Sequence, residues 1–538
     1  MRRALGFCLP FFIATAAVAQ DTRTVDLEPL RSVRGLESYT TTSRNPSQDR
    51  QRYIAATSRI REHHRPVPLP KTTKPFATEM SQVSATVVKK GEPISFPKNI
   101  KILAQKSIVG AAKLEYDFAS PVGEPTVAVR GDEILTTGNW YATLSLDAGK
   151  TFSALNPEQL FAGDPIGDGF CCDQVALYDK RDDAIYWLLQ GRKNARGNNF
   201  RVLVAKGSEQ IRKQDWFFID ITSSQAVGSE GFWLDFPSFT TTEANVFISA
   251  NIFRTDGDEK WAGSVVIRVP KEPLLRGEKP AATTWVTQTF GSPRLVDGAK
   301  GAMYWASHSS TGDLAVWSWA DGQPQPKGPA TVDIEPWTTD PGPSVAGQSP
   351  SGRPWLKRLD GRITAGWSAS GSIGFAWTAR EDNRFKLPHV RVALIDESAI
   401  LSAGPLAEVK PIAEPHIWSD EFAIAYPAVA PDVDGKIGAS VSIGGKTLNP
   451  SHAVGTLSRV GGALKWGFAV PTRGKNTPAC TKSDESVDRE CGVWGDYFAT
   501  RPHPTRAGSW VSVGYSVQST DLEKKVRIEP EYVWFNSE

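Results

Sequence analysis

Residues 123–152 read GEPTVAVRGDEILTTGNWYATLSLDAGKTF, and this stretch sets the expectation for the whole fold. Short apolar runs alternate in it with turns rich in Gly, Asp and Asn, a pattern typical of antiparallel strands joined by tight hairpins. The runs are long enough for about three or four short strands. The stretch therefore predicts one small antiparallel sheet.

The same kind of unit recurs along the chain. Further copies begin at about Cys171, Trp233, Pro293, Gly361, Glu421 and Gly495. They start roughly 55–65 residues apart, a spacing that fits propeller blades with insertions. One unit cannot cover both faces of its sheet, whereas radial stacking buries those faces and closes the ring. We predict an all-β chain that folds as a β-propeller with seven blades; six or eight blades and an array of β-sandwiches are the alternatives.

The first 110 residues differ in composition from the rest of the chain. Residues 1–19 combine Arg2 and Arg3, a short apolar run and a small-residue cleavage site, which predicts a secretory signal peptide. No later segment approaches the roughly 20 apolar residues of a membrane-spanning helix. Residues 20–110 are polar and predict an extended leader, with one helical candidate at 49–64 whose paired histidines we expect to be solvated. The propeller is expected over residues 111–538, in the periplasm or outside the cell.

The cysteine pattern fits an oxidising compartment. Once Cys8 leaves with the signal peptide, four cysteines remain: Cys171, Cys172, Cys480 and Cys491. An even number in an exported chain predicts disulfides, and three pairings are possible. We favour a vicinal Cys171–Cys172 bond with a local Cys480–Cys491 loop, because short loops close at the lowest entropic cost. The alternative is that the adjacent Cys171 and Cys172, called the doublet below, pair with Cys480 and Cys491.

Composition excludes some function classes. The chain is 40% hydrophobic and 22% charged, with a formal net charge of +2. A nucleic-acid binder would concentrate basic charge, so we expect no nucleic-acid partner. The chain has no Gly-x-Ser-x-Gly elbow, phosphate-binding loop or His-Glu-x-x-His motif. We expect a monomer whose partner is a carbohydrate or polysaccharide.

One copy of the unit carries a family motif. Ser145, Asp147, Gly149, Thr151 and Phe152 lie in SLDAGKTF, which resembles the Asp-box of sialidases and related bacterial-neuraminidase-repeat propellers. The motif suits a hairpin turn in which the Asp accepts backbone amides and the Gly takes a positive φ. In that family the box lies at the blade periphery and is structural. The resemblance therefore implies a sialidase-like fold rather than an activity.

Members of the sialidase family also bind the substrate carboxylate with three arginines, and they use a Tyr/Glu nucleophile pair with an Asp acid. The first of these arginines lies in a Phe/Tyr-Arg-Ile-Pro motif, which this chain lacks. Arg254, Arg391 and Arg501 are candidate arginines, but nothing in the sequence selects among them. The resemblance thus does not extend to sialidase activity.

The residues that open each predicted innermost strand are the candidates for a site at one mouth of the channel. Carboxylates and tyrosines in such a ring suit acid–base chemistry on a sugar, or could hold Ca²⁺ through their oxygens. Turn hydrogen bonding alone is the structural alternative. The catalytic candidates are Glu124, Asp173, Asp235, Asp496 and Tyr497. The substrate-binding candidates are Gln174, Trp233, Arg254, Tyr426 and His503.

Two functions remain open. The first is an exported carbohydrate-active enzyme, either a glycoside hydrolase or a polysaccharide lyase, the latter suggested by His503 and Tyr497 in one unit. The second is a non-catalytic propeller of the cell envelope that binds glycan or protein. Aromatic residues could stack on sugar rings, yet packing between blades explains most of them. These residues are Trp233, Trp305, Trp367, Trp377 and Trp494.

Overall fold

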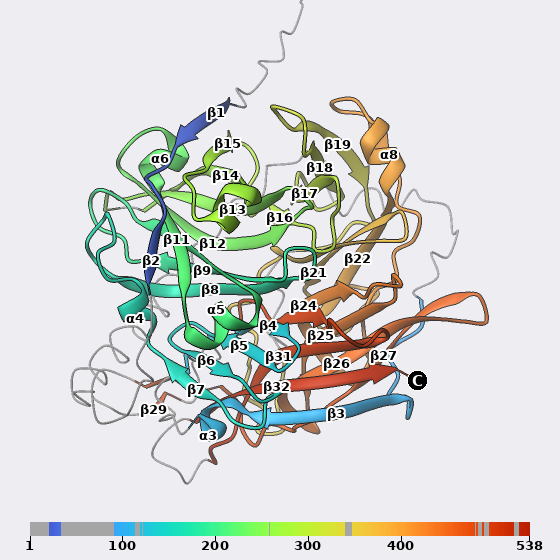
Figure 1. Cartoon of the computed structure of the whole chain (residues 1–538). Helices are drawn as coiled ribbons and strands as arrows, with labels where there is room; N and C mark the ends of the chain where they lie inside the picture. The colour runs from blue at the N-terminus through green and yellow to red at the C-terminus, as the bar shows by residue number, and fades with distance from the viewer. Residues whose placement is uncertain are drawn as a thin grey trace, which may run out of the picture.

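The fold is described from a computed structural model (Figure 1). The described residues are 21–33, 91–112, 119–120, 122–257, 259–338, 347–478, 480–481, 487–488, 494–520 and 527–537. The predicted signal peptide, the helical candidate at 49–64 and Cys491 lie outside these ranges.

Seven antiparallel sheets form a ring, and each sheet is one of the predicted units. Blade 1 consists of β4 (Thr126–Arg130), β5 (Glu133–Thr137), β6 (Ala142–Ser145) and β7 (Ser153–Leu155). Blade 2 consists of β8 (Phe170–Asp179), β9 (Ala184–Gly191), β10 (Asn199–Lys206), β11 (Trp216–Thr222) and β2 (Arg31–Val33). Blade 3 consists of β12 (Phe232–Thr241), β13 (Asn245–Arg254), β14 (Trp261–Pro270), β15 (Ala281–Thr287) and β1 (Asp21–Asp26).

The remaining blades follow the same order. Blade 4 consists of β16 (Arg294–Leu295), β17 (Ala302–His308), β18 (Asp313–Ala320), β19 (Lys327–Asp333) and a parallel strand β23 (Glu408–Val409). Blade 5 consists of β20 (Ile363–Ala369), β21 (Ser372–Ala379) and β22 (His389–Asp396). Blade 6 consists of β24 (Phe422–Pro431), β25 (Ile437–Gly445), β26 (Leu448–Val460) and β27 (Ala463–Ala469). Blade 7 consists of β30 (Ala499–Pro502), β31 (Ser509–Val517), β32 (Ile528–Ser537) and β3 (Ile100–Ser107).

The first strand of each blade is its innermost strand. These strands contact one another in the order β4, β8, β12, β16, β20, β24, β30 and back to β4, so they line the centre of a closed ring. The predicted all-β, seven-bladed propeller is therefore confirmed. A separate two-stranded ribbon joins β28 (Cys480–Thr481) to β29 (Val487–Asp488) before blade 7.

Within the described ranges, six short helices lie next to the blades. They are α3 (Ile108–Ala111), α4 (Pro157–Leu160), α5 (Gly207–Lys213), α6 (Ser223–Val227), α7 (Lys271–Arg276) and α8 (Glu397–Ser402). Most follow an outer strand and cover the rim of a sheet (Figure 1). Among the described residues, none of the helices has the length and apolarity needed to cross a membrane.

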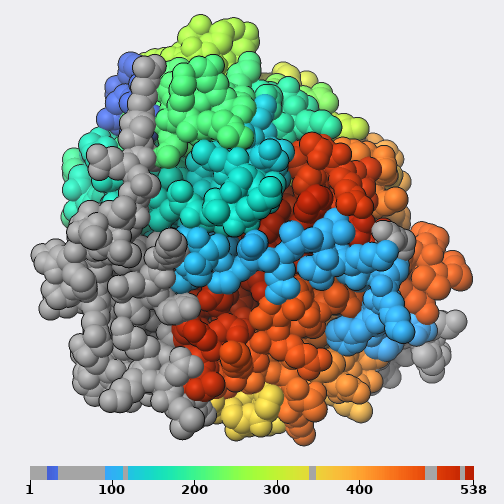
Figure 2. Space-filling view, turned by 60° about the horizontal axis from the view of Figure 1, so that its bottom comes forward, coloured from blue at the N-terminus to red at the C-terminus, as the bar shows by residue number. Residues whose placement is uncertain are grey.

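The leader supplies outer strands to the propeller. β1 pairs with β15, β2 pairs with β11, and β3 pairs with β32. In Figure 1 the blue β3 arrow lies beside the red β32 arrow, and Figure 2 shows the blue segment that contains β3 crossing the orange and red C-terminal blades. Arg31 of β2 forms an ion pair with Asp220, which also binds the buried guanidinium of Arg201. Three segments of the predicted leader thus pair with outer strands of the propeller.

Aromatic residues fill the spaces between blades. The rings of Trp285, Trp305 and Trp317 lie with centroids 5.3–5.9 Å apart where blades 3 and 4 meet. Four of the tryptophans considered for sugar stacking are fully or almost fully buried, so they serve the core. These four are Trp305, Trp367, Trp377 and Trp494.

The segment 145–152 forms the hairpin turn between β6 and β7, the two outer strands of blade 1. One carboxylate oxygen of Asp147 accepts a hydrogen bond from the Thr151 amide at 2.9 Å, and the other accepts from the Thr151 hydroxyl at 2.7 Å. These bonds lower the pKa of Asp147 to about 2. Gly149 has a φ of 79°, which favours glycine. All of this lies far from the centre of the ring.

Candidate functional site

One mouth of the channel collects a residue from every blade, near the start of each innermost strand. The contributing residues, in blade order, are Glu124, Asp173, Asp235, Arg294, Arg362, Tyr426 and Asp496. Because all innermost strands run in the same direction around the ring, their starts meet at the same end. The five catalytic candidates are electrostatic neighbours at this end of the ring.

The same backbone conformation, a left-handed residue followed by proline, recurs at this mouth. Glu124, Phe236, Ser292 and Tyr426 have φ values of 45–57°, and a proline follows each of them. In β12 and β24 this residue lies in a bulge, where two residues face one on the neighbouring strand. Left-handed backbone in a bulky residue costs free energy, and bulges re-aim side chains next to functional sites. Four blades therefore share this conformation at the end of the ring where the candidate residues lie.

Polar side chains of the preceding blade hold these strained segments. Asn251 of blade 3 accepts a hydrogen bond from the Ser292 amide at 2.7 Å. Thr378 of blade 5 accepts from the Tyr426 amide at 2.9 Å. Asn198 of blade 2 bonds both the amide and the carbonyl of Leu234 at 2.8 Å. These buried bonds between blades fix the start of each following innermost strand.

Glu124 and Asp173 form a carboxyl pair at the centre of the site. Their side chains are hydrogen-bonded to each other, which requires a proton between them. Burial, followed by the charges of Asp173 and Asp496, raises the pKa of Glu124 well above its usual range. Burial and the charge of Asp235 raise the pKa of Asp173 to about 7. The pair therefore holds a proton at neutral pH.

Asp496 has the opposite surroundings. Its Oδ2 lies 3.1 Å from a guanidinium nitrogen of Arg358 and 2.9 Å from one of Arg362. Two cations offset the cost of burying this carboxylate, so it can carry a negative charge beside the protonated pair. The site thus combines a shared proton with a stabilised carboxylate.

Tyr497 completes the cluster. Its hydroxyl is buried and has no hydrogen-bond partner among the described residues. Burial and the charges of Asp173 and Glu124 raise its pKa well above the usual value, so the phenol stays protonated. Its ring packs against Phe236, with centroids 6.0 Å apart, and the Arg362 guanidinium lies 3.9 Å from the Phe236 ring centroid. The phenol is therefore a hydrogen-bond donor for which the described part of the chain provides no acceptor.

Arginines from blades 4 and 7 form the next part of the mouth. Arg501 pairs with Asp297 at 2.6 Å. Arg294 has neither an ion pair nor a hydrogen bond from its side chain within the described ranges, and its Nε is buried. Burial lowers its pKa to about 10, so it remains charged at neutral pH. The nearby opposite charge is Asp297, but that carboxylate forms its ion pair with Arg501.

The least exposed members of the site are almost inaccessible. Relative exposure is 4% for Glu124, 7% for Asp173, 5% for Asp496 and 4% for Tyr497. Asp235 is more exposed and accepts a hydrogen bond from Gln190 Nε2 at 3.1 Å. The acid–base groups therefore lie below a rim that includes Asp235.

Three predicted binding residues lie elsewhere. Gln174 is fully buried and donates to the carbonyls of Gly138 and Tyr141, because neighbouring residues of a strand point to opposite faces. Arg254 is exposed and lies 3.9 Å from Asp256 at the end of β13. His503 follows β30, at the opposite end of that strand from Tyr497, and stacks on Trp534. The structure therefore does not combine His503 and Tyr497 in one site.

Two other binding candidates and one arginine candidate have structural partners. The Tyr426 hydroxyl donates to the Trp494 carbonyl at 2.9 Å. Trp233 packs against Phe253 and under the Lys193 ammonium group. Arg391 belongs to a separate buried cluster with Glu335 and His416. Of the three arginine candidates, Arg501 is the one that lies near Arg294 in the ring.

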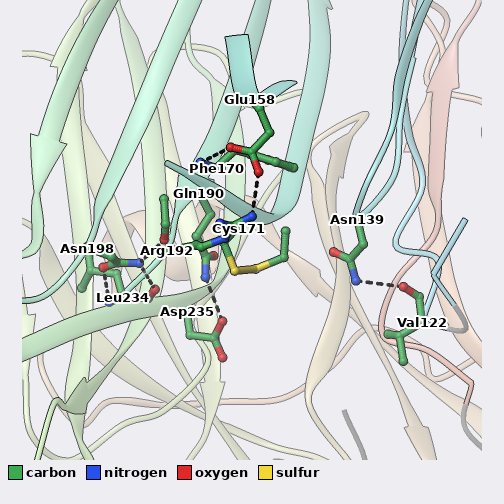
Figure 3. The surroundings of a disulfide bond; sticks show 12 residues. Val122, Asn139, Glu158, Phe170, Cys171, Gln190, Arg192, Asn198, Leu234 and Asp235 are labelled. Atoms are coloured by element: carbon green, nitrogen blue, oxygen red, sulfur yellow. Dashed lines mark hydrogen bonds and ion pairs between the residues drawn. A yellow bond between two sulfur atoms is a disulfide. The ribbon is translucent and has the colours of Figure 1, made fainter. Parts of the chain in front are cut away.

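The doublet forms the predicted vicinal disulfide, Cys171–Cys172. Figure 3 shows it beside the Gln190–Asp235 hydrogen bond, directly before Asp173 in β8. The Cys480–Cys491 pairing is not tested, because Cys491 lies outside the described residues.

The residues described show no group of three or more His, Cys, Asp or Glu side chains arranged to hold a metal ion. The carboxyl cluster fits Ca²⁺ poorly, because Glu124 and Asp173 share a proton and Asp496 is bound by two guanidinium groups. The observed donor set favours proton chemistry over cation binding.

Sequence reasoning missed the basic half of the site. Arg358 and Arg362 lie in a loop that precedes β20 and has no repeat pattern. Arg294 lies in a strand of two residues. A residue followed by proline recurs before or within four innermost strands, and this signal would have located Phe236 and the Ser292–Arg294 segment.

The similarity of this chain to known proteins is found by comparing structures and not by comparing sequences. No protein-family model and no curated protein sequence match the chain. An α-L-arabinanase from Penicillium chrysogenum is similar to it, with 10% identity, coverage of 80% of this chain and 98% of that one, and a TM-score of 0.38. The NanB sialidase of Streptococcus pneumoniae shows 9% identity, coverage of 75% and 82%, and a TM-score of 0.35. The intramolecular trans-sialidase of Ruminococcus gnavus shows 9% identity, coverage of 70% and 96%, and a TM-score of 0.34.

Proposed function

We propose that this chain is an exported carbohydrate-active enzyme that cleaves glycosidic bonds by acid–base chemistry at the mouth described above. The observation that carries the proposal is the protonated Glu124–Asp173 pair next to Asp496, which two arginines stabilise as a carboxylate. Environments that separate the protonation states of neighbouring carboxyl groups identify an acid and a base.

The groups can be assigned roles in hydrolysis. The Glu124–Asp173 pair donates its proton to the leaving oxygen as the glycosidic bond breaks. A water molecule supplies the oxygen that bonds to the anomeric carbon, and its proton passes to Asp496. Proton exchange with solvent then restores both groups. In a lyase, Asp496 would instead remove a carbon-bound proton, and the same pair would protonate the leaving oxygen.

The mouth also offers groups for substrate binding. The Tyr497 hydroxyl and the Arg294 guanidinium are polar groups that the described protein leaves unsatisfied. Sugar hydroxyls or an acidic substituent would satisfy them, and Asp235 at the rim can accept hydroxyl hydrogens. Export, predicted from residues 1–19, would place the protein where extracellular polysaccharides are found.

A panel of polysaccharides tests the proposal. Wild type and Asp173→Asn are assayed for new reducing ends and for unsaturated products, which separates hydrolysis from elimination. Asp132→Asn is the matched control, because Asp132 lies in the exposed turn at the other end of β4. We expect turnover of at least one polysaccharide by wild type and the control, and its loss in Asp173→Asn. Equal turnover by all three proteins would overturn the assignment.

A binding propeller without catalysis is the second candidate, and the low exposure of the carboxyl groups favours it. It predicts glycan binding by wild type with no product from any polysaccharide. Binding by Asp173→Asn would then equal that of wild type.

A further inference from the structure

The vicinal disulfide lies in an unusually long bulge. In the ladder between β8 and β9, Phe170 pairs with Gly191 and Gln174 pairs with Leu189. Cys171, Cys172 and Asp173 therefore face Gln190 alone. In β12 and β24 the corresponding bulges set two residues against one. The inner strand of blade 2 thus carries one residue more than its counterparts, directly before the candidate acid.

Both flanks of this bulge are fixed by hydrogen bonds. Gln174 Nε2 donates to the carbonyls of Gly138 and Tyr141, and its Oε1 accepts from Trp187 at 3.1 Å. On the other flank, the Phe170 amide donates to Glu158 at 3.3 Å. The three bulge residues are held between these anchors, and the covalent ring of the disulfide constrains two of them.

The ring faces the mouth rather than the core. Cys171 and Cys172 are partly exposed, whereas Phe170, Asp173 and Gln174 around them are buried. Figure 3 shows the sulfur atoms near the Gln190–Asp235 hydrogen bond, with Asn139 of blade 1 on the other side. A small thiol reagent that enters the mouth can therefore reach the bond.

We propose that the Cys171–Cys172 disulfide positions Asp173 against Glu124, and that its reduction by a dithiol turns the acid pair off. This inference rests on the proposed function. A thiolate of the dithiol attacks one sulfur and forms a mixed disulfide, and its second thiol displaces the protein sulfur. The protein gains two electrons and two protons as Cys171 and Cys172 thiols, and the dithiol leaves as a cyclic disulfide.

The physical reason is loss of constraint. Once the disulfide is broken, Cys171 and Cys172 regain backbone freedom. The strand ladder does not restrain them, because the bulge residues have no regular partners on the neighbouring strand. Asp173 then leaves hydrogen-bond reach of Glu124 for part of the time. Acid catalysis needs the proton donor held in place, so a small displacement costs much of the rate.

The test uses the mature chain with Cys480→Ser and Cys491→Ser, so that dithiothreitol acts on the doublet alone. Mass spectrometry counts the free thiols, and circular dichroism checks that the reduced chain stays folded. Carbon-13 NMR of labelled aspartate follows the pH titration of Asp173, with Asp173→Asn identifying the signal. This readout needs no substrate, so it stands even if the proposed activity fails.

We expect reduction to move the titration midpoint of Asp173 down by about one unit or more, because a displaced Asp173 loses the burial and the nearby Asp235 charge that raise its pKa. On a substrate that wild type cleaves, kcat falls roughly tenfold or more, while KM changes less than about threefold. Cys171→Ala with Cys172→Ala behaves like the reduced chain with or without dithiothreitol. A folded, reduced chain with an unchanged midpoint would overturn the proposal. Global unfolding on reduction would also overturn it, because the ring would then support the whole fold.

Discussion

The two ends of β8 each hold a buried aspartate, and the two side chains behave in opposite ways. At the mouth, burial and the charge of Asp235 raise the pKa of Asp173 to about 7. At the far end, Asp179 lies 2.7 Å from both Lys271 Nζ and Arg181, and these cations lower its pKa despite its burial. A buried carboxyl with matched cations holds blades together, whereas one beside other carboxyls is ready to exchange a proton. The comparison separates a structural carboxyl group from a proposed catalytic one within a single strand.

The largest effect should come from removing the two carboxylates in turn and measuring activity. Asp173→Asn is expected to lower kcat by roughly 10²–10⁴-fold, because the amide cannot donate the shared proton. Asp179→Asn should leave kcat near the wild-type value in the fraction that folds. The measurement is kcat from steady-state kinetics on the best substrate of the panel, expressed per molecule of folded protein. Similar losses of kcat in both variants would erase the distinction between the two ends.

Stability should respond in the opposite order. Asp179→Asn is expected to lower the free energy of unfolding by roughly 3 kcal/mol, because buried Lys271 keeps only Asp182 as a counter-charge. Asp173→Asn removes a proton-dependent interaction and should change stability less at neutral pH. Urea unfolding followed by tryptophan fluorescence measures both values. A more stable Asp179→Asn would contradict the structural role of that end.

The pH dependence of stability sharpens the same contrast. The folded-state pKa of Asp173 is raised, so its contribution is fully present below the unfolded value near 3.8 and is lost as pH rises through about 7. Over that window we expect the unfolding free energy to fall by roughly 1.4 kcal/mol per pH unit from this group. For Asp179, whose pKa is lowered, the contribution is present above about pH 4 and lost only in acid. Melting temperatures of wild type and Asp173→Asn from pH 4 to about 8 test this; parallel curves would refute it.

The smallest effect is expected at the edge of the same blade. Arg31 of β2 binds Asp220 from an exposed position, with 47% of its side chain accessible. Because solvent screens this pair, Arg31→Ala should lower the free energy of unfolding by about 1 kcal/mol or less. Differential scanning calorimetry in low and high salt would show a loss that shrinks as salt rises. A large, salt-independent loss would mean that the strand itself detaches.

The sequence allowed the blades and half of the site to be predicted, for a definite reason. Glu124, Asp173, Asp235 and Asp496 each open a repeated unit, so the ring brings them together once the propeller is assumed. The side chain of Gln174 points away from the mouth, because its neighbour Asp173 points toward the mouth. Strand alternation alone would have excluded it.

Other parts of the site depend on tertiary structure that no local pattern carries. Arg358 and Arg362 reach Asp496 from a loop between blades. Arg501 was a candidate among several equivalent arginines, and only the position of Asp297 distinguishes it. The leader strands β1 and β2 have little apolar character because they lie at sheet edges, so their composition predicted an extended segment but not its pairing.

The pairing of β3 with β32 has a consequence for the order of events in the cell. Ile100 is matched with Ser537, so the seventh sheet takes its outer strand from early in the chain and its other strands from the end. Such a contact joins segments that lie very far apart in the sequence, and contacts of this kind form slowly. During synthesis, six blades can assemble while the ring stays open, with exposed sheet faces on both sides of the gap. The mouth, which needs Asp496 and Tyr497 from that last blade, is therefore completed only after the final strand has emerged.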